Sequence, residues 1–179
     1  MAWTAPRTWT DGELVTKAIM DPHVRDNFLA VGPHLIARRT TDQSVTSSTV
    51  LVNDDTLQLT VAASEIWQIE FNLLYEADAA GDLKLSFSFP TSGVCYSHAA
   101  HLDAGGAVTV TQLRLTATDG SSMPLPGAGA ASPRWQPLSV LFINSTNAGT
   151  LILRWAQNTS NATATKVLTH STIWAVKLA

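Results

Sequence analysis

Residues 67–73 read WQIEFNL, and every second residue from Trp67 to Leu73 is apolar. Successive side chains of a β-strand point to opposite faces of a sheet, so this period of two is typical of a strand with one buried face. The same alternation occurs at 57–61 (LQLTV) and at 83–89 (LKLSFSF). Three half-buried strands in succession predict an antiparallel sheet with one face on a core.

Further short runs rich in apolar and β-branched residues follow the same pattern and lie between turn residues. They are 45–52, 108–115, 138–143, 151–155, 167–169 and 173–178. Turns are expected at 53–55 (NDD) and 80–82 (AGD). The sequence therefore predicts a mainly β chain, an antiparallel β-sandwich of jelly-roll type with about eight strands.

The front of the chain has a different pattern. Residues 1–10 hold Trp3 and Trp9 among Thr, Pro and Arg without a helical or strand period, which indicates an extended arm. Each tryptophan ring carries a large apolar area that must be covered by the domain itself or by another chain. We expect an N-terminal arm and helical anchor over 1–39 and a β-sandwich domain over 40–179.

A broken helical segment is predicted between the arm and the first strand. Asp21 before Pro22 is a helix-start signal, and Thr16 could cap a shorter turn through 17–20. Val24 and Phe28 share one apolar face, with Arg25 and Asp26 on the polar side. Gly32-Pro33 should end the helix.

Residues 119–137 contain several Pro and Gly residues, which predicts a long loop outside the strand ladders. We expect it to lie at one end of the sandwich or across a neighbour, as a partner-contact loop with Met123, Leu125 and Trp135.

Composition excludes several classes of function. Only 14% of the residues are charged, the net charge is −3 and no Lys/Arg run occurs, so nucleic acid is not an expected partner. The single cysteine cannot form an internal disulfide. The sequence shows neither a signal-peptide pattern nor an apolar run long enough to span a bilayer, so we expect synthesis in the cytoplasm and no membrane partner.

One cluster has the residue types of a metal or thiol site: Cys95, His98, His101 and Asp103. His98 and His101 would lie on opposite faces of a strand, which argues against metal binding. A Cys/His nucleophile would also need an orienting group and an oxyanion hole. We therefore expect no enzyme, with no catalytic, metal-binding or cofactor-binding residue and no cofactor.

The tryptophans favour a different alternative, a carbohydrate-binding module for adhesion to the host surface. Trp67, Trp155 and Trp174 lie in alternating strands, where packing in the core is expected. Trp3, Trp9 and Trp135 are the ones left to meet a partner, and Trp135 would be the sugar platform.

Two N-terminal motifs, 9–16 (WTDGELVT) and 23–28 (HVRDNF), resemble the opening of small virion proteins of phages from high-GC hosts. The stretches 43–51, 55–59, 81–84 and 153–160 resemble β modules of phage tail-associated and virion-surface proteins, so the resemblance spans nearly the whole chain. It implies a structural protein on the virion surface, as head decoration or head fibre, or as minor tail or tail fibre protein.

What the resemblance implies agrees with the residue pattern. A β-sandwich with low charge and an aromatic arm suits a symmetric homo-oligomer, since each small interface is repeated by symmetry. We expect a homotrimer bound to capsid or tail proteins, with Trp3, Trp9, Val24, Arg25, Asp26 and Phe28 as the anchor. A host surface glycan is the other expected partner.

Overall fold

The computed structural model describes residues 4–5, 7–27, 34–102, 107–116, 118 and 120–178. The chain divides into two compact units, Met1–His34 and Leu35–Ala179. The first unit ends at His34, five residues before the end of the anchor predicted over 1–39, and the first strand is β1 (His34–Arg38). In the described part of the chain no helix is long and apolar enough to cross a bilayer.

The first unit contains the helix α1 (Lys17–Met20), which continues into the π-helical turn η1 (Asp21–Arg25). Thr16 is the N-cap, with extended backbone angles (φ −100°, ψ 162°) but no capping bond from its side chain. Asp21 is helical (φ −57°, ψ −58°), so its prediction as an N-cap is wrong. Pro22 has no N–H for the bond to Ala18 O, which accounts for the wider turn at this point.

The arm folds back onto this helix at one described place. The Asn27 side chain accepts from the Thr4 N–H at 2.9 Å and donates to Thr4 O at 2.9 Å. Asn27 is buried, and its paired bonds satisfy both its own amide and the backbone of Thr4. Near the arm, Arg7 donates to Glu13 and lies over the Trp9 ring.

The second unit is built from two antiparallel sheets, with the strands that follow. They are β1, β2 (Gln43–Val45), β3 (Val52–Val61), β4 (Ile66–Glu76), β5 (Leu83–Ser88), β6 (Val94–Leu102), β7 (Val108–Leu115), β8 (Met123–Leu125), β9 (Arg134–Ile143), β10 (Gly149–Gln157), β11 (Thr165–Val167) and β12 (Thr172–Lys177).

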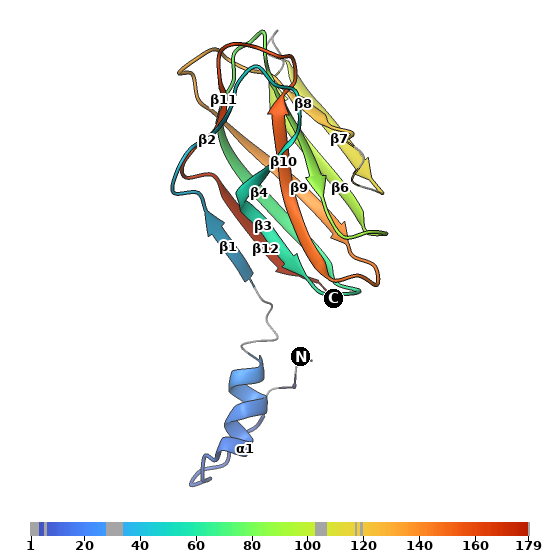
Figure 1. Ribbon diagram of the computed structural model, residues 1–179. Coiled ribbons are helices and arrows are strands. Elements are labelled where there is room, and N and C mark those ends of the chain that lie inside the picture. The colour runs from blue at the N-terminus through green and yellow to red at the C-terminus, as the bar shows by residue number, and fades with distance from the viewer. Residues whose placement is uncertain are drawn as a thin grey trace. The chain divides into compact units, whose positions relative to one another are not determined.

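The strand order confirms the predicted β-sandwich and its jelly-roll type. One sheet has the order β3-β10-β5-β8, and the other contains the run β4-β9-β6-β7 (Figure 1). The eight consecutive strands from β3 to β10 are divided between the two sheets, four in each. This division of eight strands into two four-stranded layers is the jelly-roll arrangement. Among the described residues, β1, β2, β11 and β12 extend the second sheet beyond β4.

The core lies between the two layers. Every second residue of β4 is buried, from Trp67 to Tyr75, as the alternation of 67–73 predicts. Phe71 of one sheet meets Phe87 of the other, with ring centroids 5.7 Å apart. A fully buried side chain of this size contributes about 1.5–3 kcal/mol relative to exposure, and the inner faces of both sheets consist of such residues.

Three predicted boundaries are wrong. Residues 53–55 are not a turn between strands but part of β3, where the partner register of β10 jumps from Gln58 to Asn53. The edge strand expected at 45–52 is not formed, because β2 ends at Val45 and β3 begins at Val52. The long loop predicted over 119–137 is interrupted by β8 and ends at Arg134, because each of these segments finds a partner strand far away in the sequence.

Candidate functional site

The sheet of β6 and β9 opens at one end. The paired register of the two strands stops at His98 with Ser139, although β6 continues to Leu102 and β9 begins at Arg134. The next position of β9 on this side is Pro137, which has no N–H to donate to a ladder. Pro137 therefore explains why β6 and β9 separate here.

A side chain bridges the gap that the ladder leaves. Gln136 Nε2 donates to Ala100 O at 2.9 Å and to Pro137 O at 2.6 Å. Gln136 is buried, so its amide replaces a backbone hydrogen bond between the two strands. At the opening, the Gln136 side chain thus holds the two strands together in place of the ladder.

The separation of the strands forms a cleft of about 520 Å³, which we call the β6–β9 cleft. Ligand sites of small molecules are about 300–1,000 Å³, so the volume suits one or two sugar rings. Its apolar side includes Leu102, Val108 and Trp135, all exposed, and 67% of the Trp135 surface is open. Trp135 is exposed because the alternation of β9 places its side chain on the face of the sheet away from the core.

The polar side of the cleft carries Tyr75, His101 and Arg134. The Tyr75 hydroxyl donates to Pro126 O at 2.7 Å. Burial raises the pKa of Tyr75 to about 12, and the positive charge of Arg134 opposes part of that rise. His101 Nδ1 is buried without a hydrogen-bond partner among the described residues. These polar groups thus line the same cleft as Trp135.

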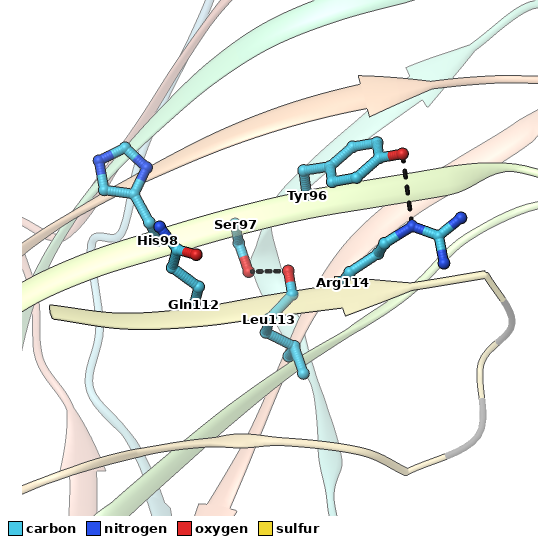
Figure 2. A pocket seen from close by; sticks show the side chains of 6 residues that line it. All are labelled: Tyr96, Ser97, His98, Gln112, Leu113 and Arg114. Carbon is cyan, nitrogen blue, oxygen red and sulfur yellow. Dashed lines mark hydrogen bonds between the residues drawn. The ribbon is translucent and has the colours of Figure 1, made fainter.

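A second, smaller groove of about 380 Å³ lies along β6 and β7 on the same sheet. Figure 2 shows its lining, in which Arg114 Nε donates to the Tyr96 hydroxyl at 3.3 Å and Ser97 donates to Leu113 O. The Arg114 guanidinium also lies 5.5 Å from the Tyr96 ring centre. Because this arginine already has an aromatic and a hydroxyl partner, fewer of its hydrogen-bond donors are available to a ligand than those of Arg134 in the β6–β9 cleft.

The cluster considered for a metal or thiol site lies on β6. His98 is exposed and Cys95 is buried, and the alternation places His98 and His101 on opposite faces, as the sequence predicts. Burial raises the pKa of the Cys95 thiol to about 12. Asp103 is outside the described residues. Across the part of the chain that the structure describes, no three His, Cys, Asp or Glu side chains gather as a metal site.

The predicted anchor residues are placed in part. Trp9 and Val24 are exposed, and Arg25 pairs with Asp21 at 3.1 Å and with Asp26 at 2.7 Å. These charged residues are close together in one helical segment, so their ion pairs are local to that segment. Trp3 and Phe28 lie outside the described residues. The role of all six residues in assembly stays a prediction.

The predicted contact loop is changed by the structure. Met123 and Leu125 are buried in β8, where Leu125 pairs with Leu83 and Met123 with Leu85. Neither side chain is free for a partner, because the apolar residues on either side of Pro124 both point into the core. Trp135 alone of the three is exposed.

The tryptophans of the strands divide differently from the prediction. Trp67 and Trp155 are buried in the core, as predicted. Trp174 is 38% exposed on the outer face of β12, so the prediction of core packing is wrong for it. Arg134 and Gln136 were missed in the sequence, and their position beside Trp135 and Pro137 was the available signal.

Comparisons with known proteins give only distant similarities. No family model matches the sequence, and no curated protein matches it. A structure of the baseplate tripod of bacteriophage Tuc2009 is 9% identical, with a TM-score of 0.31, over 98% of this chain and 76% of that chain. A structure of an endo-1,4-β-D-xylanase of Clostridium thermocellum with xylohexaose is 6% identical, with a TM-score of 0.30, over 79% and 28%.

A structure of the subviral particle of infectious bursal disease virus is 15% identical, with a TM-score of 0.22, over 80% of this chain and 40% of that chain. The chain thus spans less than half the length of the xylanase and of this viral protein. At these TM-scores the similarities carry no argument about function.

Proposed function

We propose that this chain is a structural protein of the phage virion surface, without enzymatic activity, that assembles as a symmetric homo-oligomer. The first unit is the anchor to sister subunits or to the virion, and the jelly roll faces outward. The particle location is either the head, as decoration or head fibre, or the tail, as minor tail or fibre protein.

The observation that carries the proposal is the apolar exposure of the first unit. This short unit is compact in its own right and yet leaves large apolar side chains open to solvent: Trp9, Leu14, Val15, Met20 and Val24. Apolar side chains gathered on a small surface are typical of an interaction site. Burial between subunits would remove them from water.

The chemistry of the second unit supports the same role. Jelly rolls are a common architecture of viral capsid domains and of lectins, although a fold alone does not determine function. The sequence resemblance to phage virion proteins covers both units. A low share of charged residues, 14%, leaves much of the surface uncharged and suited to packing.

The test is the oligomeric state of the full chain. We expect sedimentation and mass photometry to give a trimer at micromolar concentration, and Leu14→Ser with Val24→Ser to shift it to monomer. Val50→Ser is the matched control, since Val50 is also an exposed apolar residue but lies in the second unit. A wild-type monomer at this concentration would contradict the proposal.

A second experiment locates the protein on the particle. Antibody labelling of intact virions, followed by electron microscopy, should place the label on the particle surface. Hundreds of copies per particle would identify a capsid lattice protein, and a few copies would identify a tail protein. Virions without any label would argue against the virion role.

The second candidate is a carbohydrate-binding module for adhesion to the host. It rests on the exposed ring of Trp135 at the mouth of the β6–β9 cleft. An exposed tryptophan offers a flat apolar surface on which the C–H face of a sugar can stack. Trp135→Ala should abolish binding of the full chain to host wall polysaccharide. Unchanged binding would remove this platform.

A further inference from the structure

Arg134 differs from the other arginines of the chain. The other six each have a recorded polar or charged partner: Arg7 with Glu13, Arg25 with Asp26, Arg38 with His170, Arg39 with Asp54, Arg114 with Tyr96, and Arg154 with Leu51 O. The Arg134 side chain has neither a hydrogen bond nor an ion pair among the described residues, and it lines the β6–β9 cleft. Its guanidinium, with five donors, is therefore available to a ligand.

The charge of the cleft has one sign. Its described ionisable groups are Tyr75, His101 and Arg134, and none of its described lining residues is an Asp or Glu. With a pKa raised to about 12, Tyr75 stays neutral and does not neutralise the arginine. A fixed positive charge without a carboxylate beside it favours an anionic ligand.

The apolar wall next to this charge favours a sugar over a flexible chain. Consecutive residues of β9 alternate between the faces of the sheet, but Arg134 and Trp135 both line the cleft, and the Trp135 ring is 67% exposed. The cleft has a volume of about 520 Å³, and the buried Gln136 also lines it, so it suits a compact group. A nucleic acid would need a run of cations, which the sequence lacks.

We infer that the β6–β9 cleft binds an anionic saccharide, with the Trp135 ring stacked on the sugar and the Arg134 guanidinium bound to its carboxylate or phosphate group. His101, whose buried Nδ1 has no hydrogen-bond partner among the described residues, also lines this cleft. The inference rests on the glycan-binding candidate and names its ligand class. It is independent of the oligomeric state.

The experiment is calorimetric titration of the full chain with matched saccharides. The probes are tetragalacturonic acid, galactotetraose as its neutral counterpart, and galactose 6-phosphate for the phosphate source. We expect the wild type to bind at least one acidic probe about tenfold or more tightly than galactotetraose, because an ion-paired hydrogen bond is stronger than a neutral one. The preference should weaken as salt rises from 50 to 300 mM.

Variants separate the two contacts. Arg134→Gln should remove the preference for the acidic probe, Arg134→Lys should keep part of it, and Trp135→Ala should abolish binding of all probes. Arg114→Gln is the matched control, since Arg114 lies in the separate groove of Figure 2, and it should leave binding unchanged. Circular dichroism of each variant verifies the fold.

The outcomes distinguish the anionic ligand from glycan binding in general. Equal affinity of the wild type for acidic and neutral probes would overturn the anionic ligand and keep the glycan-binding candidate. Binding of none of the probes would overturn both. Binding of an Asp/Glu-rich peptide with no saccharide binding would also overturn both, and would assign the cleft to an acidic protein partner.

Discussion

Arg39 Nη1 donates to Asp54 Oδ1 at 2.6 Å, and both side chains are completely buried. The backbone of Arg39 is held as well, because its N–H donates to Ser171 O at 2.9 Å and its carbonyl accepts from the His170 N–H at 3.0 Å. Arg39 follows β1 directly, so this residue fastens the entry of the chain to β3 and to the β11–β12 connection.

Removal of one partner of this pair should destabilise the domain strongly. Arg39→Met leaves the Asp54 carboxylate buried without its cation, which costs about 3–5 kcal/mol. Urea denaturation of the two single variants and of Arg39→Met with Asp54→Asn checks this. The double variant should lose less free energy of unfolding than the sum of the single variants. Additive losses would show that the pair is not coupled.

Glu65 should make stability depend on pH in the acid range. Burial alone would raise the pKa of Glu65, but hydrogen bonds from Lys177, from the Ala62 N–H and from Trp67 together lower it below its ordinary value. A lowered pKa in the folded state stabilises above the unfolded pKa, and this contribution is lost as pH falls through the folded pKa.

The measurement is the free energy of unfolding of wild type and Glu65→Gln at pH 7 and at pH 3. The difference between the two proteins should be larger at pH 7. Lys177→Met should remove part of the same pH dependence, because Lys177 donates to Glu65 at 2.9 Å. Equal differences at both pH values would contradict this expectation.

Cys95 should be unreactive in the folded protein. Burial raises the pKa of its thiol to about 12, and the thiolate is the form that attacks disulfide reagents. At pH 8 the folded chain should react with Ellman's reagent far more slowly than the chain in 6 M guanidinium chloride. Fast reaction of the folded chain would mean that β6 opens locally.

Gln136 should hold the inner end of the β6–β9 cleft. Gln136→Leu removes the donor to Ala100 O, which lies on an exposed residue of β6, so the loss is that of an ordinary hydrogen bond, about 0.5–1.5 kcal/mol. Denaturant unfolding measures the loss, and hydrogen exchange should rise in 99–102 of β6. Gln112→Leu, on the outer face, is the control and should change little. Faster exchange in both variants alike would argue against a brace.

The alternation of apolar residues predicted most of the sandwich, because the faces of a strand depend only on backbone geometry. It missed β6, β8 and β1. In β6 the histidines and alanines gave no apolar alternation, and β8 has only three residues around Pro124. Their pairing with β7, β9 and β5 depends on residues distant in the sequence, which a local pattern does not contain.

The residues of the candidate site were likewise predicted only in part from the sequence. Trp135 was predicted as a contact residue; it is exposed, and its contact role stays a prediction. Met123 and Leu125 were expected in a contact loop but are buried, since short apolar segments around a proline look alike in a loop and in an edge strand. His101 was weighed only for a metal site or a Cys/His nucleophile, and Arg134 was missed, because neither carries a motif of a binding site.

The sequence by itself determined that this chain forms half-buried strands in a mainly β sandwich, through a period of two that follows from the geometry of each strand. Only the tertiary structure decided where the sheet opens. Pro137 leaves a gap because the strand opposite it is β6, some forty residues earlier in the chain, and no local pattern shows which backbone carbonyl would face the missing N–H.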